Sequence, residues 1–203
     1  MASAIKYYNV LVLGSFAVGK TSIESWLAND RDRNKRPDVN LFNRDYYDVR
    51  VDLCTGEKII VRLWDTIELE KDNNLPTSYI RNRDGFILVW DIKRGSTLKE
   101  LIELYKVTLT FYGDEHMPAY VIFANKAEME MRQNSEEYES CQNWSLKHNI
   151  NCYKTSTTTG ANLEEGLDRL VEMMTMKEPV VRRKKQSVDI DLTEVRTQSK
   201  CCN

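Results

Sequence analysis

The chain of 203 residues has little of what builds metal centres or disulfide frameworks. It contains only two histidines, His116 and His148, which stand apart in the sequence. Its five cysteines are an odd number and do not have the spacing of zinc ligands. We therefore expect neither a metal cluster nor a set of structural disulfides. Both histidines are expected to be ordinary exposed residues of loops or helices.

Long apolar runs are also missing, and charge is unevenly distributed. No run approaches the 18 residues of a membrane-spanning helix, and the chain does not start like a secretory signal peptide. The formal net charge is −2, but residues 177–203 carry 7 Lys and Arg against 4 Asp and Glu. The missing signal peptide and membrane span predict a cytosolic protein. Length and charge predict one domain over residues 1–176, followed by a flexible, variable, basic tail over residues 177–203.

The most informative motif follows an apolar, strand-like stretch and opens an amphipathic one. With the serine that follows it, this predicted phosphate site consists of Gly14, Ser15, Phe16, Ala17, Val18, Gly19, Lys20, Thr21 and Ser22. Its backbone amides can form a nest for anions, Lys20 adds positive charge for the outer phosphates, and Thr21 offers a hydroxyl to Mg²⁺. The alternative is a glycine-rich turn that matches by chance, but the strand before it and the helix after it favour a P-loop.

Strand-like and helix-like segments alternate along the chain. Apolar or alternating stretches predict strands at Val10–Leu13, Tyr46–Leu53, Lys58–Trp64, Gly85–Ile92, Ala119–Ala124 and Asn151–Tyr153. Helices are expected after the P-loop, after a capping box formed by Thr97 and Glu100, around Tyr138–Leu146, and over the apolar residues from Leu163 to Met174.

This alternation predicts an α/β fold of the P-loop NTPase class. Its six-stranded, mostly parallel sheet should carry helices on both faces and include one hairpin. In such sheets ligands bind at the carboxyl ends of the strands. The P-loop, Asp65, Asn125 and Thr155 all fall at that edge, so we expect the functional site there.

Four further segments, in the expected order, resemble motifs of the Ras superfamily of small GTPases, and of the Rab family in particular, over residues 6–176. LWDT at 63–66 resembles the start of WDTAGQE, SYIR at 78–81 resembles SYYR of switch II, NKAE at 125–128 resembles the guanine-reading NKxD, and KTST at 154–157 resembles ETSA. The final CCN at 201–203 is similar to Rab ends that receive two geranylgeranyl groups. The resemblance implies the G domain fold.

The resemblance also implies a ligand, namely GTP or GDP with Mg²⁺. Thr21 and Asp65 would serve the metal. The implied guanine-binding residues are Asn125, Lys126, Glu128, Ser156, Thr157 and Thr158. Glu128 stands where the family has Asp and is one methylene longer, so guanine should remain preferred over adenine, at reduced affinity.

Positions that the family uses for hydrolysis are altered. The family's Ala-Gly-Gln falls on Ile67, Glu68 and Leu69, and a leucine cannot orient the attacking water. Phe16 stands where the family has a small residue, so it would crowd an arginine finger supplied by an activating protein. We therefore assign no catalytic residue and expect GTP hydrolysis to be slow or absent.

Switch I departs from the family as well. No Ser or Thr lies between Asp38 and Tyr47, where the family supplies a hydroxyl to Mg²⁺, and Asn40 or Asn43 would be weak substitutes. The polar run 31–37 takes the place of the aromatic residue that the family lays on guanine. This run is either a basic effector-binding arm or simply a solvated loop.

Three functions remain open. The first is a Rab-like GTP-binding regulator of vesicle-mediated protein transport; the second is a pseudo-GTPase scaffold with structural or no nucleotide; the third is a P-loop kinase or ATPase of another class. The first implies prenylation at Cys201 and Cys202, which would make the protein a lipoprotein on the cytoplasmic face of an intracellular membrane, with a cytosolic pool.

The expected partners follow from that first function. They are prenylation escort proteins, proteins of the GDP-dissociation-inhibitor type, and effector proteins at the switch surface, with no nucleic acid among them. The basic run Arg182–Lys185 would favour acidic lipids, although a nuclear signal or simple solubilising charge are alternatives.

Overall fold

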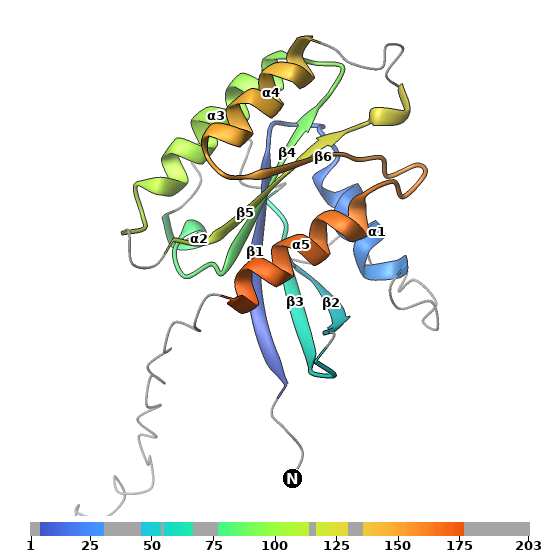
Figure 1. Cartoon of the computed structure of the whole chain (residues 1–203), viewed down its shortest axis with the longest axis vertical. Helices are drawn as coiled ribbons and strands as arrows, with labels where there is room; N and C mark the ends of the chain where they lie inside the picture. Colours follow the sequence, from blue (N-terminus) through green and yellow to red (C-terminus); the bar gives the residue numbers. More distant parts are fainter. Residues whose placement is uncertain are drawn as a thin grey trace, which may run out of the picture.

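Six strands form a single sheet in the order β2-β3-β1-β4-β5-β6 (Figure 1). The computed structural model describes residues 5–30, 46–53, 55–66, 77–113, 117–129 and 136–176. The strands are β1 (Lys6–Gly14), β2 (Tyr46–Asp52), β3 (Lys58–Trp64), β4 (Gly85–Asp91), β5 (Ala119–Asn125) and β6 (Asn151–Lys154). β2 pairs with β3 in an antiparallel hairpin, and the other four neighbouring pairs are parallel.

Helices cover both faces of this sheet (Figure 1). Side chains of α1 (Lys20–Asp30) and α5 (Leu163–Met176) pack into one apolar cluster with the sheet. Those of α2 (Thr77–Ile80), α3 (Ser96–Leu109) and α4 (Glu136–Lys147) pack into a second cluster on the opposite face. The predicted α/β P-loop NTPase architecture, with a six-stranded, mostly parallel sheet between helices, is confirmed.

The burial pattern of a strand explains why its sequence predicts a strand. β4 and β5 are buried along their whole length because helices cover both of their faces, and such strands read as continuous apolar runs. β2 instead alternates between exposed and buried residues, as expected for a strand with one face toward the core. The predicted strands therefore lie within a few residues of the observed ones.

The predicted capping box is wrong. The residue before α3 is Gly95, which caps the helix without a side-chain hydrogen bond, and Thr97 lies inside the first turn. The Thr97 hydroxyl donates to the carbonyl oxygen of Arg94 at 2.6 Å and accepts from the amide of Asp91 at 3.0 Å. Thr97 thus fastens the end of β4 to the start of α3, and Glu100 faces the P-loop instead of the helix terminus.

Several predictions concern residues outside the described ranges and stay predictions. These are residues 67–69 of switch II, the polar run 31–37, the switch I positions up to residue 45, His116, and the tail 177–203. Of the two histidines, His148 is described and is exposed at the end of α4. Within the described ranges, no helix has the length and apolar character needed to span a bilayer.

Candidate functional site

The P-loop connects the carboxyl end of β1 to α1, and its two glycines are required by close approach of other groups. A Cβ atom at Gly14 would lie 2.2 Å from the backbone oxygen of Val89 on the neighbouring β4. Gly19 has a φ of +102°, and a Cβ there would lie 2.4 Å from the side-chain nitrogen of Asn125. The loop backbone is thereby held against β4 and Asn125.

Lys20 lies at the start of α1, with only 4% of its surface exposed. Its Nζ donates to the carbonyl oxygens of Gly14 and Ser15, each at 3.0 Å, so the ammonium group closes back over the loop. A buried ammonium at a helix N-terminus favours anions for two reasons, namely its own charge and the helix dipole. The predicted phosphate site is thus assembled around Lys20.

Thr21 and Asp65 meet beside the loop. Thr21 belongs to the first turn of α1, Asp65 follows β3, and the Thr21 hydroxyl donates to Asp65 Oδ2 at 2.9 Å. Hydroxyl and carboxylate oxygens are hard ligands of the kind that Mg²⁺ takes alongside phosphate oxygens and waters. The two residues predicted for the metal are therefore neighbours, and their chemistry fits Mg²⁺. Ser22, also predicted for the phosphate site, is exposed in the same turn.

Asn125 and Lys126 hold the P-loop from the end of β5. Asn125 Nδ2 donates to the carbonyl oxygen of Val18 at 2.8 Å, and Lys126 Nζ donates to that of Ala17 at 2.9 Å. Lys126 has a φ of +66°, which is uncommon for a residue other than glycine. Backbone strain of this kind collects at functional sites.

The loops after β5 and β6 are joined to each other. The amide of Ala127 donates to the carbonyl oxygen of Thr155 at 3.0 Å, and the amide of Thr155 donates to that of Ala124 at 2.9 Å. Thr157 lies in the second of these loops and is partly exposed. The two segments predicted to read guanine therefore lie side by side, next to the P-loop.

Glu128 is tied to this second loop. Its Oε1 accepts from the Thr158 hydroxyl at 3.2 Å, while Ser156 Oγ accepts from the amides of Thr158 and Thr159 at 3.2 and 3.1 Å. Desolvation favours the neutral carboxyl, but hydrogen bonds from Ser156 and Thr158 and the charge of Lys126 outweigh it and hold the pKa of Glu128 below its ordinary value. Glu128 is thus an anion at neutral pH, as an acceptor for guanine must be.

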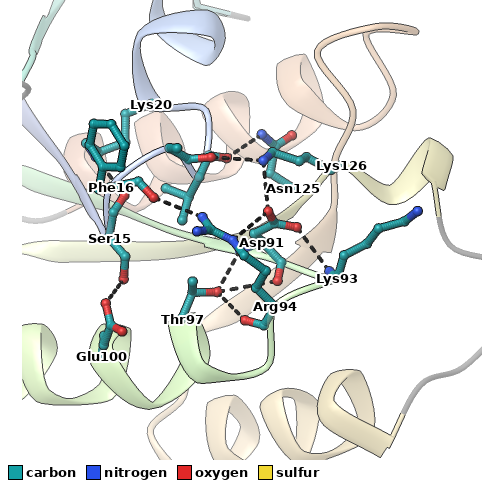
Figure 2. A network of polar contacts seen from close by, with 12 residues as sticks. Ser15, Phe16, Lys20, Asp91, Lys93, Arg94, Thr97, Glu100, Asn125 and Lys126 are labelled. Carbon is teal, nitrogen blue, oxygen red and sulfur yellow. Dashed lines mark hydrogen bonds and ion pairs between the residues drawn. The ribbon is translucent and has the colours of Figure 1, made fainter.

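A second polar network, which the sequence patterns did not predict, lies on the α3 side of the P-loop (Figure 2). Asp91 Oδ2 accepts from Lys126 Nζ at 2.8 Å and from Arg94 Nε at 3.1 Å. Arg94 Nη2 in turn donates to the carbonyl oxygen of Phe16 at 2.9 Å. This network therefore links the ends of β4 and β5 to the P-loop.

The Asp91 carboxyl is buried and ionised. Burial alone would raise its pKa, but hydrogen bonds from Lys126, from the backbone amide of Lys93 and from Arg94 together lower it below its ordinary value. One signal could have found this residue. Asp91 ends β4 at the same sheet edge as Asp65 and Asn125, where polar residues after buried strands mark ligand sites.

Aromatic side chains gather where β2, β3 and α2 approach each other. Trp64 lies 5.2 Å from Tyr46 between ring centroids, the Arg62 guanidinium lies over Tyr46 at 3.9 Å, and the Arg83 guanidinium lies over Trp64 at 4.5 Å and Tyr79 at 6.0 Å. Tyr46, Trp64 and Tyr79 are exposed or partly exposed. We call these three residues the aromatic surface. Each of them stands at or near the end of a segment predicted to be a switch.

The fold is that of a P-loop domain of the small-GTPase type, and it brings the P-loop, the Thr21–Asp65 pair and the joined loops after β5 and β6 together at one sheet edge. Residues 9–176 match the Ras family. The chain belongs to that family.

Within the Ras family, the chain is similar to proteins named as Rab proteins. The chain is 27% identical to Ras-related protein Rab-10 of Diplobatis ommata, covering 97% of this chain and 96% of the relative. It is 27% identical to Ras-related protein Rab7 of Drosophila melanogaster over 76% and 74% of the two chains, and 26% identical to Ras-related protein Rab-13 of Bos taurus over 99% and 98%. The resemblance to the Ras superfamily, and to Rab proteins within it, is confirmed.

Proposed function

We propose that this protein binds GTP and GDP with Mg²⁺ and acts as a membrane-anchored, Rab-like regulator of vesicle traffic. The observation that carries the nucleotide part is the convergence of three elements at one sheet edge. These are the P-loop with its buried Lys20, the Thr21–Asp65 pair, and the joined loops of Asn125 and Thr155. The similarity to Rab proteins supports the cellular role.

Base selection in this proposal depends on Glu128. An ionised carboxylate accepts two hydrogen bonds from the ring and amino nitrogens of guanine, an arrangement that adenine cannot reproduce. The bond from Thr158 and the neighbouring Lys126 hold this carboxylate at the mouth of the joined loops. Asn125 and Lys126 would then contact the base and ribose, and the amide of Thr157 would meet the guanine carbonyl oxygen.

Titration of the Mg²⁺-loaded protein with GDP, GTP and ATP, followed by calorimetry, tests this function. We expect both guanine nucleotides to bind and ATP to bind at least about 100-fold more weakly, the scale of a lost polar recognition element. Glu128→Gln should weaken GDP binding about tenfold or more, because a charge-assisted pair is replaced by a mismatched amide.

The matched control is Glu139→Gln, which makes the same chemical change at an exposed position of α4 and should leave binding unchanged. Equal affinity for ATP would contradict a guanine site and favour another class of P-loop protein. No heat with any nucleotide would favour a scaffold of the pseudo-GTPase type.

Effector proteins are proposed to dock on the aromatic surface, where Tyr46 is exposed and Trp64 and Tyr79 are partly exposed. Aromatic and arginine side chains are over-represented at the centres of protein interfaces, and Arg62 and Arg83 stack on these rings. Trp64→Ala should remove GTP-dependent effector binding while leaving GDP affinity near the wild-type value, because the Trp64 indole contacts Asn9, Tyr46 and Arg83, none of which is assigned to the nucleotide site.

Membrane attachment is proposed at Cys201 and Cys202, outside the described residues, with escort and GDP-dissociation-inhibitor-type proteins handling the prenylated chain. One lipid chain gives marginal binding, whereas two give stable anchoring, so Cys→Ser at both positions should move the protein from the membrane fraction to the cytosol. Neutralising Arg182–Lys185 should mainly change which acidic membrane is chosen, at about 1 kcal/mol per basic residue.

Mass spectrometry of the protein from its native cells, together with fractionation, measures this outcome. An unmodified C-terminus, with a distribution that the double substitution does not alter, would contradict the anchoring proposal.

A further inference from the structure

Three consecutive carbonyl groups of the P-loop accept hydrogen bonds from side chains outside the loop (Figure 2). The pairs are Phe16 with Arg94 at 2.9 Å, Ala17 with Lys126 at 2.9 Å, and Val18 with Asn125 at 2.8 Å. In a trans peptide the carbonyl and the following amide point in opposite directions, and no cis peptide is found among the described residues. Each outer donor therefore turns the next amide of the loop toward the opposite side.

Arg94 is the one of these donors that comes from the α3 side of the site, and it is held at two points. Its Nε bonds to Asp91 Oδ2 at 3.1 Å and its Nη2 bonds to the Phe16 carbonyl. Asp91 is itself immobilised, because its Oδ1 accepts from the amide of Lys93 at 3.0 Å and its own amide donates to Thr97 at 3.0 Å. A planar guanidinium suits such bridging, since its N–H groups diverge in a fixed fork.

α3 itself also contacts the P-loop. The Ser15 hydroxyl donates to the carboxylate of Glu100, which lies one turn further along α3 than Thr97 (Figure 2). Ser15 and Phe16, the second and third residues of the P-loop, are thus both hydrogen-bonded to the segment that follows β4. No switch residue takes part in either contact.

We propose that Arg94, oriented by Asp91, is a positioning residue for phosphate binding. By holding the Phe16 carbonyl, Arg94 directs the amide of Ala17 into the phosphate cradle, and its positive charge on the carbonyl side polarises that peptide group so that the amide becomes a stronger donor. The inference rests on the proposed nucleotide binding, and it assigns part of the preorganisation of the P-loop to the segment between β4 and α3.

Comparison of GDP with GMP in an Arg94→Ala variant tests this role. A nest of backbone amides contacts the β-phosphate, which GMP lacks. If the Ala17 amide is no longer held toward the phosphates, the affinity for GDP should therefore fall more than the affinity for GMP. We expect the GDP dissociation constant to rise about tenfold, the effect of one charge-assisted hydrogen bond, and that of GMP to change by less than about twofold. Equal weakening of both nucleotides would indicate a merely structural role and overturn the proposal.

Arg169→Ala is the matched control. Arg169 also forms an ion pair with a carboxylate three residues away, Glu172 at 2.9 Å, and its side chain is 42% exposed against 44% for Arg94. It lies on α5, outside the site, so its removal should leave GDP and GMP affinities at the wild-type values.

Amide hydrogen exchange in the nucleotide-free protein gives a second readout. Arg94→Ala should speed exchange in the peptide that covers residues 15–19, because the loop loses one outer tether, whereas Arg169→Ala should not. Unchanged exchange in Arg94→Ala, or wild-type GDP affinity in that variant, would overturn the proposal while leaving guanine binding intact. Wild-type protein that binds no guanine nucleotide would instead refute the proposed function and, with it, this role in binding.

Discussion

Replacing Lys20 with alanine should abolish tight binding of GDP and GTP. The ammonium group is buried at the start of α1 and lies within 3.0 Å of two P-loop carbonyls, so it is already confined to the mouth of the loop. Charge-assisted hydrogen bonds contribute about 1.5–3 kcal/mol each, and an ammonium can make two or three of them to phosphate oxygens. We therefore expect the dissociation constants to rise by about 100-fold or more.

The Lys20→Ala substitution should also loosen the P-loop itself, in addition to removing a contact with the nucleotide. Without Lys20, the carbonyls of Gly14 and Ser15 lose the donors that they have in the structure, so the loop is expected to be looser before nucleotide arrives. Lys106→Ala is the control, because Lys106 is exposed on α3 and forms an ion pair with Glu103, one turn away, at 2.7 Å. Calorimetry or competition with a fluorescent nucleotide measures both variants. Lys20→Ala with wild-type affinity would contradict the assignment of this loop to phosphate.

The sequence predicted those parts of the molecule that local chemistry dictates. The P-loop was recognisable because Gly14 and Gly19 are each required by close contacts and Lys20 follows at a fixed offset. β4 and β5 were recognisable because a strand buried on both faces must be apolar throughout. The joining of Asn125 to Thr155 followed from a general rule, since the ends of neighbouring parallel strands meet at one edge of the sheet.

The polar network on the α3 side of the P-loop was not predicted, because its contacts with the loop join residues far apart in the chain. Arg94 reaches Phe16 across 78 positions, and Ser15 reaches Glu100 across 85. No periodicity or spacing encodes such a contact. Thr97 and Glu100 also have the offset of a capping box, so a local explanation competed with the correct one and was chosen. Only the position of Asp91 at the end of a buried strand gave a usable signal.

GTP hydrolysis should be at least about tenfold slower than in a Rab-10 relative measured side by side. Three parts of the phosphoryl-transfer apparatus are altered: the water-orienting glutamine is replaced by Leu69, the switch I hydroxyl has no counterpart, and Phe16 stands where a small residue is expected. Leu69 and switch I lie outside the described residues. Phe16 is described, and its side chain is 77% exposed at the rim of the P-loop, where an activating arginine would approach.

Single-turnover release of phosphate from GTP-loaded protein measures this rate. Leu69→Gln alone should recover less than about threefold, because groups that act as one catalytic unit are strongly non-additive and the other two parts stay altered. The double variant Leu69→Gln/Phe16→Ser should hydrolyse GTP faster mainly in the presence of an activating protein. An arginine finger is worth about 10³–10⁵ in rate, but only where the P-loop leaves room for it beside the phosphates. The GDP dissociation rate serves as the control for an intact site. An ordinary Rab rate in the unmodified protein would contradict the prediction, and it would mean that residues other than Leu69 position the attacking water.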